Sequence, residues 1–166
     1  MHKNILHLMF TIVIVLAISG CVGSDVNDTD IPSQDRAGII HVASLGDINA
    51  ALESGAVLVE IGSERCPTCK AQMPIMEEIA AEYEGRASVM YIDTAKVGAL
   101  GFGVRYVPDS FVIVGIENKT YVYMKPDGQI TSNREEARFV GLTRKAVLTQ
   151  TLDHALEELN RSSLQV

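Results

Sequence analysis

Two cysteines separated by two residues, in Cys66-Pro67-Thr68-Cys69, are the side chains best suited to chemistry. If this segment opens a helix, the second sulfur lies within disulfide reach of the first. The first thiolate then faces the unpaired N–H groups of the helix N-terminus, which favour negative charge. Pro67 suits a first helical turn because its missing N–H is not needed there. The positive charge of Arg65 would also favour the thiolate. We therefore interpret the motif as a redox-active pair.

Two other uses of a Cys-x-x-Cys motif remain open at this point. Half of a zinc site would need two further ligands at suitable spacing. Beyond the first 20 residues the chain offers only His41 and His154, and each is isolated in the sequence. A structural disulfide across so short a loop would stabilise little beyond one helical turn. We favour the redox-active pair over both.

The elements around the motif are those that would position it. Residues 56–61 form a continuous apolar run of strand length, typical of a central buried strand, and residues 66–84 carry apolar side chains at helical spacing. Shorter runs predict strands at 38–42, 88–92, 111–116, 120–124 and 138–140, a helix from Ser44 to Gly55, and a closing helix capped by Thr143. This order implies an α/β fold with a central mixed sheet and helices on both faces.

Composition limits the function further. The chain has 166 residues, room for one domain, and is 47% hydrophobic, which suits a folded core. Its net charge of -7 repels phosphate backbones, and 5% aromatics without Trp argue against base stacking. Three cysteines are too few for a disulfide-stapled mini-protein or a four-thiolate zinc site. We expect no nucleic-acid partner, no metal and no cofactor.

The N-terminus predicts export. After Lys3, residues 5–18 are almost all apolar, a length that fits the core of a signal peptide (about 7–15 residues) better than a membrane span (about 20). Ile18-Ser19-Gly20-Cys21 resembles the lipobox of prokaryotic lipoproteins, which implies cleavage before Cys21 and a lipid on its thiol. An uncleaved hydrophobic anchor is the alternative. Both predict that the rest of the chain lies at the outer face of the cytoplasmic membrane.

These patterns divide the chain into four parts. Residues 1–20 are predicted to be a lipoprotein-type signal peptide, and residues 21–37 the lipid-anchor cysteine with a flexible acidic tether, since they lack apolar periodicity. Residues 38–160 form the folded domain, and residues 161–166 a disordered tail.

The segment around the motif resembles the thioredoxin family. The strand at 57–61 is similar to the family's central strand, with Glu60 in place of the acid six residues before the first cysteine. Lys70 directly follows the second cysteine, and Pro74, five residues after that cysteine, matches the proline of the active-site helix. The resemblance extends over roughly residues 39–160 and implies a thioredoxin-like fold.

A second stretch of resemblance lies further along the chain. Gly-Val-Arg-Tyr-Val-Pro at 103–108 is similar to the segment that ends in the family's cis-proline. The chain departs from the family at two positions. Arg65 stands where thioredoxins usually carry Trp, and we predict that it contacts the substrate. Asp109 follows the proline, and we expect it to add negative charge close to the thiols. The stretch from 108 to 141 is longer than the family's hairpin, so we expect an enlarged hairpin region after the proline.

The resemblance implies a role for each site residue. Cys66 as thiolate attacks a substrate disulfide, and Cys69 then resolves the mixed disulfide by forming the Cys66–Cys69 bond. Glu60, buried and raised in pKa by desolvation, accepts the proton of Cys69; a solvent-facing glutamate is the alternative. A cis Pro108 presses against the disulfide and leaves the Val107 backbone free to pair with an extended substrate. The alternative is a trans Pro108 in an ordinary turn.

The sequence thus predicts a lipid-anchored, extracytoplasmic thiol-disulfide oxidoreductase. We expect a monomer that exchanges disulfides with exported proteins and is recycled by a redox partner. Two other functions stay open: a non-enzymatic binding or chaperone module with a normal Cys66 pKa, and a metallochaperone that holds Cu(I) between Cys66 and Cys69. The sequence does not specify the direction of electron flow.

Overall fold

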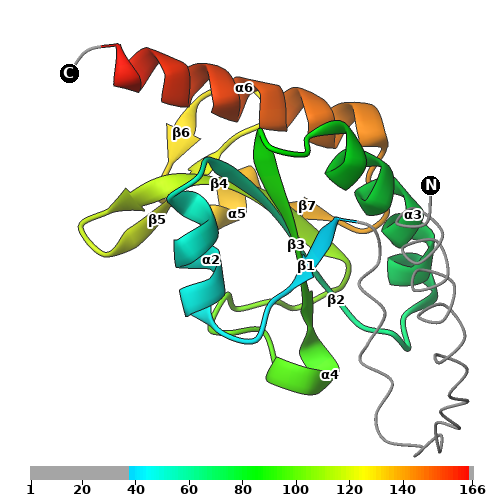
Figure 1. Cartoon of the computed structure of the whole chain (residues 1–166). Coiled ribbons are helices and arrows are strands. Elements are labelled where there is room, and N and C mark those ends of the chain that lie inside the picture. Colours follow the sequence, from blue (N-terminus) through cyan, green and yellow to red (C-terminus); the bar gives the residue numbers. More distant parts are fainter. Residues whose placement is uncertain (1–37, 165–166) are drawn as a thin grey trace, which may run out of the picture. The chain divides into compact units, whose positions relative to one another are not determined.

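The structure, a computed structural model, describes residues 38–164 (Figure 1). The predicted signal peptide, Cys21 and the tether lie outside the described residues. The strands are β1 (Ile39–His41), β2 (Ala56–Gly62), β3 (Ala87–Asp93), β4 (Asp109–Glu117), β5 (Thr120–Met124), β6 (Ile130–Thr131) and β7 (Phe139–Val140). The helices are α2 (Leu45–Leu52), α3 (Pro67–Glu82), α4 (Thr94–Val97), α5 (Arg134–Ala137) and α6 (Lys145–Ser163).

The strands of the described region form one mixed sheet in the order β1-β3-β2-β4-β5-β6, and β7 pairs with the first two residues of β4. β1 and β2 each run parallel to β3, whereas β4 runs antiparallel to β2 and to β5. Every residue of β2 is buried, because this strand has a neighbour on each edge and helices over both faces. The predicted α/β fold with a central mixed sheet is confirmed.

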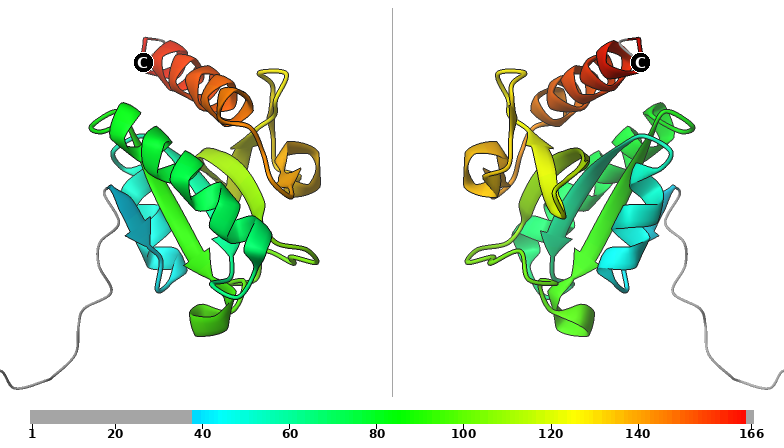
Figure 2. Two further views of the ribbon diagram at one scale, coloured as in Figure 1. Left: turned by 90° about the vertical axis from the view of Figure 1, so that its right-hand side faces the viewer. Right: turned by 90° about the vertical axis from the view of Figure 1, so that its left-hand side faces the viewer.

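Helices cover both faces of the sheet (Figures 1 and 2). α3 and α6 pack on one face, where Met76, Ile79 and Leu148 join Leu58 of β2 in a single core cluster. α2 packs on the other face, where Ile48 joins the side chains that alternate with Leu58 along β2. This alternation decides which residues of β2 can reach α3: those in step with Leu58, which include Glu60.

The local signals at the start of α3 act as the sequence predicted. Cys66 is the N-cap, with extended backbone angles, and Pro67 occupies the first helical turn. Pro74 stands inside the helix, which nevertheless continues to Glu82. At α2, Asp47 accepts hydrogen bonds from the N–H groups of Ala43 and Ser44, as in the capping box that the sequence indicated.

The stretch between Pro108 and Gly141 contains the enlarged hairpin region. β4 and β5 form the predicted hairpin, and the chain then adds β6 and the short helix α5 before β7 returns to the start of β4. β6 and α5 are too short for hydrophobic periodicity to indicate them.

Two predicted boundaries at the C-terminal helix are wrong. The N-cap of α6 is Arg144 and not Thr143, whose backbone groups are bonded to α3. The predicted disordered tail from residue 161 is wrong for residues 161–163, because α6 continues through Ser163. Ser162 and Ser163 donate hydroxyl hydrogen bonds to carbonyls one turn earlier, and Arg161 pairs with Glu158, so polar residues prolong the helix.

No helix within residues 38–164 has both the length and the hydropathy required to cross a membrane.

Candidate active site

Cys66 stands half-buried at the N-terminus of α3. Its sulfur accepts a hydrogen bond from the N–H of Cys69 at 3.2 Å, so the thiol caps the helix as an N-cap side chain. The Cys66 thiol also donates to the carbonyl oxygen of Val107, 3.7 Å away. The geometry therefore places the first sulfur between a helix N-terminus and the segment before Pro108.

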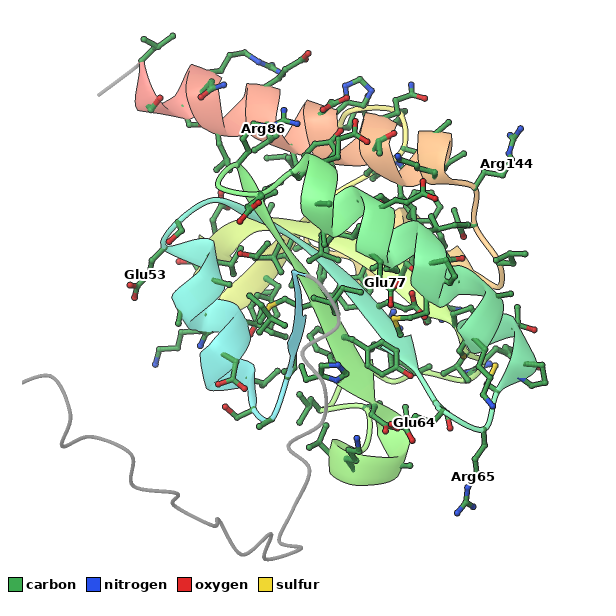
Figure 3. All side chains as sticks on the ribbon, turned by 45° about the vertical axis from the view of Figure 1, so that its right-hand side comes forward. Glu53, Glu64, Arg65, Glu77, Arg86 and Arg144 are labelled. Atoms are coloured by element: carbon green, nitrogen blue, oxygen red, sulfur yellow. The ribbon has the colours of Figure 1, made fainter. Side chains whose placement is uncertain are left out.

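The surroundings of Cys66 favour its thiolate. Burial opposes ionisation, but interactions with the Cys69 thiol and with the N–H groups of Cys69 and Thr68 outweigh it, so the pKa of Cys66 lies below its ordinary value. Arg65 has no part in this shift, contrary to our expectation. Its side chain points away from the domain into solvent, because the residue precedes the N-cap and lies on an exposed turn (Figure 3).

Cys69 is the opposite kind of thiol. It lies on the first turn of α3 with 1% of its surface exposed. Burial, reinforced by the hydrogen bond and the negative charge of Cys66, raises the pKa of Cys69 to about 12. The Cys-Pro-Thr-Cys motif thus holds one thiol ready to ionise beside one that is strongly protonated. Both thiols are free in the structure.

Glu60 lies on β2 beneath α3 and is completely buried. Neither carboxylate oxygen has a hydrogen-bond partner within residues 38–164. Desolvation alone raises the pKa of Glu60 to about 8, and its charge in turn raises the pKa values of both Cys66 and Cys69. The alternative of a solvent-facing glutamate is therefore wrong. A carboxyl that titrates near neutrality beside a thiol is suited to exchange a proton with it.

Pro108 lies opposite the motif. The Val107–Pro108 peptide bond is cis, as the resemblance implied, and Pro108 is buried while Val107 is half-buried. The N–H of Gly141 donates to the carbonyl oxygen of Pro108 at 2.8 Å, which joins the segment after β7 to this loop. Apart from the contact with the Cys66 thiol, the Val107 backbone has no hydrogen bond in the described region.

Asp109 does not add its charge to the thiols, and our expectation on this point is wrong. It lies on the sheet face opposite α3, in step with Phe111 and Ile113. There its carboxylate pairs with Arg134 at 2.8 Å and with Arg138 at 2.9 Å. A strand places successive side chains on opposite faces, and the two arginines balance a charge that would otherwise be buried alone.

Two contributors to the site were missed in the sequence. Gln72 of α3 is fully buried and bonds both backbone groups of Thr143: its amide donates at 3.1 Å and its oxygen accepts at 2.7 Å. Tyr91 of β3 pairs in register with Glu60 and is 3% exposed. The only sequence signal for Gln72 is its polarity on the apolar face of a helix. The only signal for Tyr91 is the glycine at position 62 of the neighbouring strand.

The described residues contain no group of three or more His, Cys, Asp or Glu side chains that could hold a metal ion.

Comparison with known proteins gives a consistent result. A family model described as Thioredoxin matches residues 46–133, slightly more than half of the chain. Thioredoxins of Staphylococcus aureus, strains Mu50 / ATCC 700699 and MW2, are 40% identical over 47 residues, which are 28% of this chain. The match spans 45% of the length of those curated relatives.

Solved structures share the fold. A mutant thioredoxin from Halobacterium salinarum NRC-1 aligns with a TM-score of 0.54 and 20% identity, over 71% of this chain and 90% of its own. Trichomonas vaginalis thioredoxin aligns with a TM-score of 0.51 and 20% identity, over 73% of this chain and 96% of its own.

Proposed function

Since this chain belongs to the thioredoxin family, we propose that it is a thiol-disulfide oxidoreductase that works through Cys66 and Cys69. The observation that carries the proposal is the contrast between the two thiols. The pKa of the half-buried Cys66 is lowered and that of the enclosed Cys69 is raised to about 12. A nucleophile needs the first property, and a second thiol that acts only after the first has reacted needs the second.

In the reducing direction, the Cys66 thiolate attacks one sulfur of a substrate disulfide. A sulfur–sulfur bond forms between Cys66 and the substrate as the substrate's own bond breaks, and the departing sulfur takes a proton from solvent. The negative charge on Cys66 is lost in this step. Because the charge of Cys66 is one of the causes that raise the pKa of Cys69, its loss lowers that pKa.

The second step transfers the proton of Cys69 to the Glu60 carboxylate. The Cys69 thiolate then attacks the sulfur of Cys66, the mixed disulfide breaks, and the second substrate sulfur leaves. The protein gains the Cys66–Cys69 disulfide and gives up two electrons, which reduce the substrate. Oxidation of a substrate dithiol follows the same steps in reverse.

Exposed apolar side chains near Cys66 provide a surface for a protein substrate. Tyr106, Val140 and Leu142 are 69%, 48% and 56% exposed, and the hydrogen bond between Gly141 and Pro108 holds their two segments together. We assign Val107 to backbone pairing with an extended substrate, whose N–H would replace the Cys66 thiol at the Val107 carbonyl. Arg65 is free in solvent to contact the same substrate.

The N-terminal sequence supports a place for this reaction. A signal peptide at 1–20 and a lipid on Cys21 would tether the domain at the outer face of the cytoplasmic membrane. Exported proteins acquire and exchange disulfides in that compartment. We therefore assign exported thiol and disulfide proteins as substrates, with a separate redox partner that recycles the motif.

Single serine variants test the activity with a chromogenic aromatic disulfide. Cys66→Ser is expected to abolish turnover, because the nucleophile is lost. Cys69→Ser is expected to trap the mixed disulfide on Cys66, visible as a mass increase that a reductant removes. Cys21→Ser is the matched control and should keep full turnover, since it removes a thiol outside the motif.

Full activity of Cys66→Ser would refute the assignment. An inactive wild type that binds Cu(I) tightly would instead favour the metallochaperone, and the redox potential of the pair would order oxidase, isomerase and reductase.

A further inference from the structure

Four polar or ionisable side chains form a row across the sheet under α3. His41 of β1 pairs with Tyr91 of β3, Tyr91 pairs with Glu60 of β2, and Glu60 pairs with Ser110 of β4. Their face is the one that α3 covers, because Leu58 and Val112, two residues away on β2 and β4, belong to the core cluster beneath that helix. Asp93, two residues after Tyr91, lies on this face at the end of β3.

The ring of Tyr91 occupies the space above Gly62. A Cβ atom on Gly62 would lie 2.7 Å from Cε2 and 2.8 Å from the hydroxyl oxygen of Tyr91. The backbone of Gly62 needs no glycine, since its φ is not in the left-handed region. Its missing side chain therefore gives the tyrosine room to lean towards the carboxyl end of β2. The cysteine motif begins four residues after that end of the strand.

Buried oxygen atoms without a hydrogen-bond partner are concentrated in this row and beside it. Within residues 38–164 such side-chain atoms are both oxygens of Glu60, Oδ2 of Asp93 and Oγ of Ser110, and all three residues lie in the row or beside it. Buried polar atoms in proteins are almost always satisfied, either directly or through ordered water. One cluster of them points to a shared hydrogen-bond network.

Tyr91 is the group that can connect this network. Its hydroxyl can donate and accept at once, and none of the hydrogen bonds within residues 38–164 involves it. Burial and the charges of Asp93, Glu60 and Cys69 raise its pKa, so it remains protonated and can donate to a carboxylate. Asp93 lies at the edge of the network, where Oδ2 is 3.7 Å from the exposed Lys96.

We propose that Tyr91 is a positioning residue whose hydroxyl, through ordered water, links the buried Glu60 carboxyl to Asp93 at the end of β3. This inference rests on the proposed function and adds to it the path of the proton. Glu60 receives the proton of Cys69, the tyrosine hydroxyl accepts it while passing its own proton towards Asp93, and solvent takes it up there. No electron moves in this step.

Tyr91→Phe tests the link, because it removes one oxygen and keeps the ring above Gly62. The loss of a donor to the charged carboxylate should raise the pH at which Glu60 titrates by about one unit, a tenfold change in proton affinity. Carbon-13 NMR of the Glu60 carboxyl measures that midpoint. The groups that face Glu60 are Cys66 and Cys69 at the start of α3, Tyr91 and Asp93 from β3, Ser110 from β4 and His41 from β1. Because the two thiols are among them, the titration is followed in the reduced protein throughout.

Kinetics separate the two chemical steps. Resolution by Cys69 at pH 7 should slow about tenfold in Tyr91→Phe, whereas attack by Cys66, measured in the Cys69→Ser background, should not change. Gly62→Ala keeps the hydroxyl but displaces it, and is expected to move the Glu60 midpoint in the same direction.

Tyr83→Phe is the matched control. Tyr83 is a buried phenol in the same core cluster, but it stands at the C-cap of α3 and donates to Asp153 at 2.8 Å. This variant should leave the Glu60 midpoint and both rates unchanged. An unchanged midpoint in Tyr91→Phe, or an equal shift in Tyr83→Phe, overturns the link. A wild type without disulfide turnover refutes the proposed function instead, and the titration still decides the link.

Discussion

At the scale of single residues, Glu60 has consequences beyond the thiols. Its carboxyl is fully buried, bonded to nothing in residues 38–164, and titrates near pH 8. An isolated buried carboxylate is costly, so the folded protein holds the proton to a much higher pH than the unfolded chain does. The same group that suits proton exchange therefore destabilises the fold in alkaline solution.

Glu60→Gln is expected to stabilise the protein above pH 8 and to remove a pH dependence. Between the unfolded pKa of 4.5 and the folded value of about 8, the folded state binds more protons, so the free energy of unfolding falls as pH rises. The full loss is on the order of 5 kcal/mol for a shift of this size. Urea unfolding at pH 5 and pH 9 measures it.

The neutral amide keeps the size of the side chain, so the variant and the wild type should be similar in stability at pH 4. Glu77→Gln, at a half-buried position of α3, is the control and should follow the wild-type curve. A wild type with the same stability at pH 5 and pH 9 would show that Glu60 is not shifted.

At the scale of elements, the segment from Arg134 to Thr143 ties the two halves of the site together. Its arginines hold Asp109 at the start of β4, Gly141 bonds Pro108, and Thr143 bonds Gln72 of α3. The loop with the cis-proline and the helix with the cysteines are thus fixed to one connecting segment. Their mutual position depends on buried polar contacts as well as on the core.

Asp109→Ala is expected to cost about 3–5 kcal/mol of stability, because it leaves two largely buried guanidinium groups with only the exposed carboxylate of Glu135 as a partner. Lys145→Ala is the matched control. Its ammonium pairs with Glu78 and Glu82 on the surface, at 3.2 and 3.0 Å, and such exposed pairs contribute little to stability. Thermal and urea unfolding of both variants at pH 7 measure the difference; equal losses would contradict it.

The sequence predicts features that depend on neighbouring residues, and it does not predict contacts between residues far apart in the chain. The cysteine motif, the strand before it and the buried Glu60 are local: a few neighbouring residues set the strand, the N-cap and the face on which each side chain lies. The family resemblance supplied Pro108 and its cis bond. The partners of Asp109 lie 25 and 29 residues further along the chain, and the contact of Gln72 with Thr143 spans 71, so no local pattern indicates them.

The pair of Tyr91 and Gly62 shows the same limit within the sheet. Each residue fits a strand, and only the register between β2 and β3 brings the ring over the glycine. Arg65 shows the reverse error, since adjacency in sequence suggested an effect on Cys66 that the turn of the backbone removes.

At the scale of the whole molecule, the sheet separates two tasks. The face under α3 carries the thiols, Glu60 and Tyr91, while the opposite face carries an apolar cluster and the Asp109 ion pairs. The chemistry therefore needs only one face and one end of the sheet. The proposed lipid attachment at Cys21 involves neither Cys66 nor Cys69, so we expect location and activity to be separable by mutation.

Cys21→Ser is expected to abolish lipid attachment without affecting disulfide turnover. A diacylglyceryl thioether needs the Cys21 sulfur, whereas exchange needs only Cys66 and Cys69. Cells supplied with an alkyne-tagged fatty acid should label the wild type and not this variant, and the wild-type mass should lack residues 1–20. The double variant Cys66→Ser, Cys69→Ser is the control and should be labelled normally. A wild-type peptide that still contains Met1 to Gly20, or label retained by Cys21→Ser, would mean that an uncleaved anchor or another residue holds the chain, and the lipoprotein assignment would fail while the thiol chemistry stands.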